Sequence, residues 1–306
     1  MRDVPTFGLI VPCHNGAQYL PRLLASVRAQ TRPFDEIWLF DDGSTDNSAA
    51  LAHQAGMRVL RADSPRGPAA ARNQLAAACN CTWLHFHDVD DTMAPRYLER
   101  VAAVARADTD LIICDMLWVE EDTERVENHW RYDHAALIRH PAAYLLVNTI
   151  GGINGLYRRA TFLAAGGFDE TLTYWEDMDL NVRLFARGLR CTVVNEDLVT
   201  AYRRRASYSN ANLGEVWRVK LRIMQRMLAG ADAELATAIA AEAEIIGGRL
   251  ATLARWEDVP AALALCRQAG GHPPTTKSPV LCLLKLVLPD IWCFRLQYRL
   301  RHPAKV

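Results

Sequence analysis

Three short polar segments near the N-terminus each follow an apolar run, and their side chains are suited to binding a ligand. They are residues 12–16, 41–46 and 88–91. In residues 41–46, Asp-Asp-Gly-Ser-Thr-Asp, carboxylate and hydroxyl oxygens can cap the first turn of a helix or accept hydrogen bonds from a ligand. On the residues alone, both interpretations stay open.

Residues 88–91, Asp-Val-Asp-Asp, place three carboxylates at the end of an apolar run. Like charges at that spacing repel one another unless a cation or hydrogen-bond donors compensate them. Mg²⁺ and Mn²⁺ prefer carboxylate oxygens and often bridge a protein carboxylate to a substrate phosphate. The segment therefore favours a divalent-cation site over a solvated acidic turn.

His85 and His87 precede these carboxylates and alternate onto one face of the same expected strand. Histidines beside carboxylates indicate a rival hypothesis, a transition-metal site in a metallohydrolase. However, no second cluster of histidine and carboxylate has matching spacing, and a buried histidine more often makes core hydrogen bonds than binds metal. The residues therefore favour an oxygen-rich metal site.

Two further segments hold charged side chains in the first turn of an expected helix. Arg72 lies where a helix dipole attracts anions, so it can face a ligand or the solvent. Glu176 and Asp177 follow Trp175 and begin a helical run. A carboxylate beside a substrate hydroxyl can act as a general base, and a tryptophan can stack on a sugar; such carboxylates also simply stabilise helix dipoles.

The elements that must position these residues alternate between strand-like and helix-like segments. The expected strands are 7–11, 36–40, 58–62, 83–87 and 111–116, and the expected helices are 19–30, 44–55, 68–79 and 95–107. This alternation predicts βαβ units in a doubly wound α/β domain with a parallel sheet. Ligands of such sheets bind beyond the carboxyl ends of the strands, where the three polar segments fall.

The pattern changes further along the chain. Beyond about residue 120 it loosens into polar segments with glycine turns at 151–152 and 166–167, which we expect to carry a second substrate. Residues 213–270 are rich in Ala and Leu at helical spacing, and a Gly-Gly-His-Pro-Pro break precedes a last segment. We predict one domain over residues 1–208 and a helical C-terminal extension over residues 209–306.

The 306 residues are half hydrophobic and 23% charged, which excludes collagen-like and disordered classes. Lys plus Arg and Asp plus Glu both number 35, so the net charge does not favour a nucleic-acid partner. The charge is unevenly distributed along the chain, because residues 277–306 carry a net charge of +5 and the remaining residues a net charge of −5. That basic segment interleaves cations with apolar and aromatic residues, which suits an anionic membrane surface or a terminal helix pair packed on the domain.

The eight cysteines are spread along the chain without CxxC spacing, which favours free thiols in a reducing compartment. The N-terminus lacks the features of a signal peptide, and no run reaches the roughly 18 apolar residues of a spanning helix. We therefore expect a cytoplasmic location, with peripheral attachment to the inner face of the cell membrane if residues 277–306 bind lipid.

In this order, the segments resemble the family 2 glycosyltransferases, which have the GT-A nucleotide-diphospho-sugar transferase fold. Residues 11–16 are similar to the opening strand and loop of the family, residues 41–46 to its nucleoside-binding turn, and residues 67–73 to the helix before its metal-binding strand. Further along, residues 155–159 and 166–170 are similar to its acceptor-side segments, and residues 176–177 to its late acidic pair. Residues 88–90 occupy the place of the DxD motif, with His87 where an apolar residue is usual. The resemblance spans about residues 5–205 and implies a mixed, mostly parallel sheet flanked by helices.

The resemblance implies an inverting transfer of a sugar from a nucleotide-diphospho-sugar to a hydroxyl of a glycan or lipid-linked acceptor, in surface polysaccharide synthesis. The donor is expected to be UDP-linked and the cofactor Mn²⁺ or Mg²⁺. A catalytically silent nucleotide-sugar or glycan-binding scaffold is the alternative. By position, the resemblance implies that Pro12, Asn15, Asp41 and Asp42 bind the nucleoside, that Arg72 contacts the base or diphosphate, and that Asp88 contacts the ribose or sugar. It implies that Asp90 binds the metal. On the acceptor side, it implies that Asp177 is the general base, that Glu176 orients the acceptor, and that Trp175 and Gly155 bind it.

The chain departs from this family after Tyr202. A histidine often follows there and completes the metal or diphosphate site, but this sequence continues Arg203-Arg204-Arg205. Arginine does not ligate a cation, but its guanidinium binds phosphate as a fork. Either the metal has fewer protein ligands, or Arg204 or Arg205 takes over part of the charge neutralisation. We favour the second interpretation over a solvated basic patch.

Overall fold

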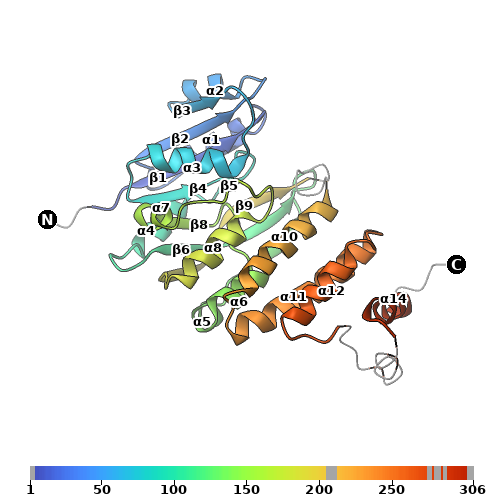
Figure 1. The fold of residues 1–306 in the computed structure, drawn as a ribbon. Coiled ribbons are helices and arrows are strands. Elements are labelled where there is room, and N and C mark those ends of the chain that lie inside the picture. The colour runs from blue at the N-terminus through green and yellow to red at the C-terminus, as the bar shows by residue number, and fades with distance from the viewer. Residues whose placement is uncertain (1–3, 205–211, 274–277, 279–283, 285–287, 302–306) are drawn as a thin grey trace. The chain divides into compact units, whose positions relative to one another are not determined.

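The computed structural model describes residues 4–204, 212–273, 278, 284 and 288–301 (Figure 1). The chain divides into two compact units, one of residues 1–141 and 148–207 and the other of residues 142–147 and 208–306. The domain boundary predicted between residues 208 and 209 lies outside the described residues, and so does Arg205.

Within the described residues of the first unit, nine strands form one sheet in the order β3-β2-β1-β4-β8-β6-β9-β5, with β7 paired to β6 (Figure 1). The first four positions of this order are joined by parallel pairs, whereas β8 runs antiparallel to both β4 and β6. The strands are β1 (Phe7–Cys13), β2 (Glu36–Asp42), β3 (Arg58–Ala62), β4 (Trp83–Phe86), β5 (Thr92–Met93), β6 (Leu111–Glu120), β7 (Val126–Trp130), β8 (Gly155–Arg158) and β9 (Cys191–Arg203). The predicted α/β class with a mixed sheet is confirmed.

The helices of the first unit are α1 (Leu20–Arg28), α2 (Ser48–Gln54), α3 (Pro68–Ala78), α4 (Tyr97–Ala103), α5 (His134–Arg139), α7 (Arg159–Ala164) and α8 (Glu176–Ala186). All five strands expected from the first 116 residues form, and each of the four expected helices forms within its predicted range. Strand β4 is buried along its whole length, because strands pair on both of its edges and helices cover the parallel sheet.

The register of the parallel strands places the polar segments at one edge of the sheet. Cys13 at the end of β1 pairs with Asp41 in β2, and Ile10 pairs with Phe86 at the end of β4. Because parallel strands point the same way, the loops after all three strands emerge at their shared carboxyl edge. The predicted meeting of residues 12–16, 41–46 and 88–91 is therefore a consequence of the register.

Helix α3 packs on β1 and β2 through small side chains. Ala69, Ala70 and Ala71 are buried, so the helix backbone approaches the sheet closely. Pro68 stands in the first helical turn, where its fixed φ and missing N–H are tolerated. Arg72 follows these alanines directly, and its side chain is therefore buried inside the unit and not exposed to solvent.

The second unit is helical, as the composition of residues 213–270 predicts (Figure 1). Its helices are α6 (Pro141–Val147), α10 (Leu213–Leu228), α11 (Ala233–Thr252), α12 (Val259–Gln268) and α14 (Asp290–Arg301). Pro141, the first residue of α6, belongs to the first unit. Inside it, the Nζ of Lys220 lies 2.7 Å from Oε1 of Glu242, and both side chains are buried. Among the described residues, no helix combines the length and apolarity that a membrane crossing needs.

Candidate active site

The loops after β1 and β2 are joined by hydrogen bonds. The Nδ1 of His14 donates to the carbonyl oxygen of Asp42 at 2.7 Å. Asn15 donates its backbone N–H to Oγ of Ser44, and its Oδ1 accepts the N–H of Thr45, both at 2.9 Å. These bonds hold Asn15 at φ 51°, a left-handed conformation that asparagine tolerates better than most residues. Pro12, two residues after Ile10, lies at the same edge.

The carboxylates of Asp41 and Asp42 are both buried and bound to the protein itself. Asp41 accepts the N–H of Ser44 at 3.0 Å and lies 3.3 Å from Nε of Arg61. Asp42 accepts the N–H groups of Arg66 and Gly67, one on each oxygen, at 2.8 Å. Asp42 thus fixes the start of α3. From the sequence, only a nucleoside contact is predicted for this residue and not this structural role.

Arg72 joins two segments that are far apart in the sequence. Its Nη2 donates to Oδ1 of Asp88 at 2.6 Å, and its Nη1 donates to Oε1 of Glu176 at 2.8 Å. Burial alone would lower the pKa of Arg72, but the charges of Asp88 and Glu176 outweigh it and raise this pKa above its usual value. Gly152 makes room for the pair, since an added Cβ would lie 3.2 Å from Nη2 of Arg72.

Asp177 is partly buried beside this ion-pair cluster. Burial and the charge of Glu176 raise the pKa of Asp177 to about 7, although Arg72 opposes the shift. Asp177 accepts the N–H of Met178 on one oxygen at 2.7 Å. Trp175, just before α8, has φ 64°, a conformation that bulky residues rarely adopt and that is enriched at functional sites.

Asp90 is surrounded by arginines. Its carboxylate contacts Nη2 of Arg204, and its carbonyl oxygen accepts a hydrogen bond from Nη2 of Arg22 at 2.5 Å. Neighbouring Asp91 is buried and accepts the N–H of Tyr202 at 2.9 Å; burial raises the pKa of Asp91 well above its usual value. Asp91 is thus a structural residue, and Asp88 and Asp90 are the two acids of the segment with partly exposed carboxylates.

The donor chemistry at this end of β4 fits a hard divalent cation. The side chains of Asp88 and Asp90 are 37% and 29% exposed, and carboxylate oxygens are the ligands that Mg²⁺ and Mn²⁺ prefer. In the structure, each of these carboxylates is paired with an arginine. A cation at Asp90 would therefore compete with Arg204.

The rival transition-metal site at His85 and His87 is not supported. Both rings are fully buried, and His85 bonds to the hydroxyl of Tyr97 at 2.7 Å and lies 3.2 Å from the ring of His87. Burial lowers the pKa of His87 to about 4 and that of His85 well below its usual value. Among the described residues, the one group of three candidate metal ligands is Glu36, Cys79 and Cys81, which includes neither histidine.

The contact of Gly155 with the acceptor stays a prediction, and the structure gives this glycine a packing role as well. Gly155 is buried, and an added Cβ would lie 2.6 Å from the ring of Tyr157. The glycine therefore makes room for Tyr157, whose hydroxyl donates to Oδ1 of Asn181 at 3.0 Å. Asn181 in turn donates to the carbonyl oxygen of Asp177 at 2.8 Å. Sequence reasoning missed Asn181, although it lies one helical turn after Asp177.

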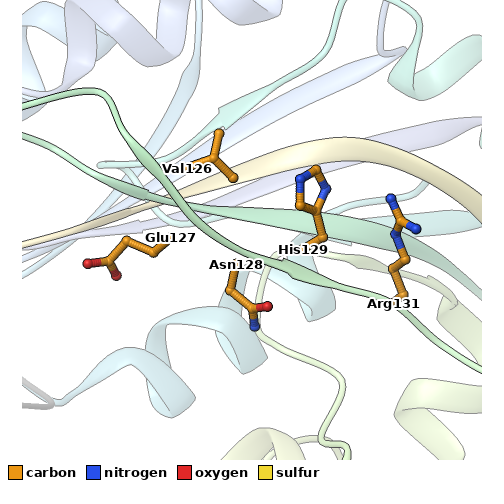
Figure 2. A pocket seen from close by; sticks show the side chains of 5 residues that line it. All are labelled: Val126, Glu127, Asn128, His129 and Arg131. Atoms are coloured by element: carbon orange, nitrogen blue, oxygen red, sulfur yellow. The ribbon is translucent and has the colours of Figure 1, made fainter.

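A shallow concavity of about 480 Å³ runs along β7 (Figure 2). Consecutive residues of that strand and the one just after it form its lining: Val126, Glu127, Asn128, His129 and Arg131. None of them is among the predicted site residues. The candidate site is instead formed by the ion pairs that join the segment after β4 to α3, to α8 and to Arg204, which directly follows β9.

Comparison with known proteins relates the chain to one family. The profile of "Glycosyl transferase family 2" matches residues 9–163, half of the chain. The chain is 29% identical over 211 residues to the "Succinoglycan biosynthesis protein ExoU" of Rhizobium meliloti, covering 61% of this chain and 59% of that protein. It is 32% identical over 126 residues to the "Putative glycosyltransferase EpsH" of Bacillus subtilis, covering 40% and 36%. The chain thus spans less than two thirds of these relatives.

Solved structures share the fold. The S. aureus protein TarS 1-349 in complex with UDP-GlcNAc has a TM-score of 0.60 at 17% identity, covering 90% of this chain and 95% of that one. The mannosyltransferase PcManGT of Pyrobaculum calidifontis, in complex with GDP-Man and Mn²⁺, has a TM-score of 0.61 at 16% identity, covering 98% and 86%. From the match of the family profile, the chain belongs to glycosyl transferase family 2.

Proposed function

We propose that the protein is an inverting glycosyltransferase that moves a sugar from a nucleotide-diphospho-sugar to a hydroxyl of a glycan or lipid-linked acceptor. The observation that carries the proposal is the pairing of Arg72 with both Asp88 and Glu176. It joins the segment expected to bind the donor to the acidic pair expected to activate the acceptor, so both substrates can meet at one place. The TarS and PcManGT complexes with nucleotide sugars support this class of donor.

In the proposed reaction, Asp177 accepts the proton of the acceptor hydroxyl while its oxygen attacks the anomeric carbon from the face opposite the diphosphate. A base works best when its pKa is near the working pH, and a pKa of about 7 meets this condition. Glu176, held by Arg72, orients the acceptor, and Trp175 packs on a sugar ring. Pro12, Asn15, Asp41 and Asp42 form the nucleoside side.

A divalent cation, Mn²⁺ or Mg²⁺, would be held by Asp90 and would neutralise charge on the leaving nucleoside diphosphate. Asp88 would contact the ribose or the sugar. Arg204 lies beside Asp90 and, as a guanidinium, can bind a phosphate oxygen. UDP is the expected nucleotide, by family resemblance and because a UDP-GlcNAc complex exists for a protein of the same fold.

The test of the proposal is Asp177→Asn, assayed with purified protein, Mn²⁺ and a panel of UDP- and GDP-sugars. Because the amide cannot take a proton, sugar transfer and donor hydrolysis should fall by about 10²–10⁴-fold, the range that loss of a general base produces. Binding of the nucleoside diphosphate should be retained. Asp122→Asn, an exposed acid in the β6–β7 turn, is the matched control and should be fully active.

Two outcomes would count against this function. Undiminished transfer by Asp177→Asn would remove the role of Asp177 as the base. Nucleotide-sugar binding without transfer or hydrolysis in the unmodified protein would instead favour the catalytically silent scaffold.

We also propose that α14 contacts an anionic membrane surface, which suits a lipid-linked acceptor. Trp292, Leu296 and Leu300 follow helical spacing and are exposed, Trp292 to 57% and Leu300 to 66%. Phe294 is buried on the opposite side of the helix. The exposed stripe lies among arginines of the +5 segment, a combination typical of helices that lie in a membrane interface.

A further inference from the structure

Arg204 stands where the family resemblance leads one to expect a histidine, and three groups hold it. Its Nη2 contacts the carboxylate of Asp90, its Nε lies 3.1 Å from Oε2 of Glu121, and its guanidinium carbon lies 4.2 Å from the ring centre of Tyr19. The side chain is only 24% exposed. The side chain of Arg204 is therefore held in place by neighbouring residues and is not part of a solvated basic patch.

Arg22 completes this arrangement from the other side. Its Nη2 lies 2.8 Å from Oε1 of Glu121, and its guanidinium carbon lies 3.8 Å from the ring centre of Tyr202. Glu121 thus contacts one arginine with each of its oxygens. It would keep hold of Arg204 even if that guanidinium left Asp90.

We propose that Arg204 competes with the divalent cation for Asp90, and that a nucleoside diphosphate relieves the competition by drawing the guanidinium onto its phosphate oxygens. This inference rests on the proposed function. A carboxylate oxygen that contacts a guanidinium group is not free to ligate a metal ion, so the two occupants exclude one another. Because a guanidinium has five N–H donors, Arg204 can stay ion-paired with Glu121 while its terminal nitrogens bind phosphate.

The competition couples the two ligands. Without nucleotide, the cation must displace Arg204 and so binds weakly; with nucleotide, Asp90 is already released. By thermodynamic reciprocity, the factor by which the nucleotide strengthens cation binding equals the factor by which the cation strengthens nucleotide binding. A histidine at this position would instead ligate the cation directly and would not exclude it.

Calorimetric titration of the full chain with MnCl₂, alone and with saturating UDP or GDP, tests the inference. In Arg204→Ala, the affinity for Mn²⁺ in the absence of nucleotide should rise about tenfold, equivalent to about 1.4 kcal/mol. The strengthening of Mn²⁺ binding by the nucleotide should shrink correspondingly. Arg203→Ala is the matched control: this neighbour is 58% exposed and pairs with Glu127, so its loss should leave both affinities unchanged.

Arg204→Gln provides a second variant, because it removes the charge but keeps a hydrogen-bond donor for Glu121. Asp90→Asn added to either variant should abolish the gained Mn²⁺ binding. The proposed competition would be overturned if the unmodified protein and both Arg204 variants bound Mn²⁺ with equal affinity in the absence of nucleotide. This holds even if sugar transfer requires the metal. No Mn²⁺ binding by the unmodified protein even with nucleotide would instead refute the metal site of the proposed function.

Discussion

At the scale of single residues, the pKa of Asp177 makes the proposed reaction sensitive to pH. A base must be unprotonated, and a group with a pKa of about 7 is mostly protonated at pH 6 and mostly ionised at pH 8. We expect kcat/KM to rise about tenfold between these values, provided that no other group titrates there. A rate that stays flat over this interval would contradict the role of Asp177.

The same shift predicts a change in stability. The folded-state pKa of Asp177 lies above its unfolded value, so the stability contributed by the protonated group is complete below pH 4 and is lost as the pH rises through 7. Asp177→Asn, which stays neutral, should therefore resist urea better than the unmodified protein at pH 8. At pH 4 and below, the two proteins should unfold at about the same urea concentration.

Arg72 is the residue on which the charge balance of the site depends. Its removal leaves Asp88 and Glu176 without their shared cation, and breaking the buried pair with Glu176 costs about 3 kcal/mol. We therefore expect Arg72→Met to lower the free energy of unfolding by that amount in urea titrations. Arg96→Met, which removes an exposed pair with Glu99, should change it by less than about 0.5 kcal/mol. Comparable losses in both variants would show that Arg72 is not buried as described.

At the scale of elements, the turn before α8 is fastened to α3 by Asn73, the neighbour of Arg72. Asn73 donates to the carbonyl oxygen of Phe168 and accepts its N–H, both at 2.9 Å. Gly167 permits this contact, because its φ is +68° and an added Cβ would lie 2.5 Å from Oδ1 of Asn73. Gly166 has φ +83° but nothing within 4 Å of an added Cβ.

These two glycines give a matched test of how the turn is attached. Alanine at either position costs about 1 kcal/mol for the left-handed backbone, but Gly167→Ala should cost about 1–2 kcal/mol more, because it displaces Asn73. In an Asn73→Ala background, the difference between the two alanine variants should disappear. Urea denaturation of six proteins measures this coupling: the unmodified protein, the two glycine variants, Asn73→Ala and the two double variants. An unchanged difference in the Asn73→Ala background would disprove it.

At the scale of the whole molecule, the neutral net charge is a cancellation between a body of −5 and a C-terminal segment of +5. The structure of helix α14 is compatible with both interpretations of that segment, packing on the protein and contact with a membrane. One side packs within the helical unit, where the ring of Tyr298 lies 5.4 Å from that of Trp256, and the other side exposes its apolar stripe. Packing and the proposed membrane contact therefore use different faces of the same helix.

Membrane contact is best tested in the full chain, because truncation would also remove packed residues such as Phe294. Trp292→Glu combined with Leu300→Glu places negative charge on the exposed stripe. Cosedimentation with anionic phosphatidylserine vesicles should fall at least tenfold, since apolar contact and charge attraction are both lost. Ile245→Glu, an exposed apolar position on α11, is the control. Equal binding by all three proteins would leave α14 with a packing role only.

The sequence by itself determined the local elements and the order of the motifs. Apolar runs and breakers act over a few residues, so β1–β4, β6 and the helices between them could be predicted, and so could the edge where residues 12–16, 41–46 and 88–91 meet. The sequence also indicated the departure at Arg204, since a guanidinium and an imidazole differ in chemistry wherever they lie.

Only the tertiary structure decided how these residues are used. The insertion of β8 between β4 and β6, antiparallel to both, depends on pairing between distant segments, which no local pattern encodes. The same holds for the burial of His85 and His87, for the packing role of Gly155, and for the ion pairs of Arg72 and Arg204 across 104 and 114 positions. Such contacts arise when packing brings distant side chains together, and the resulting burial and charges set the pKa of Asp177.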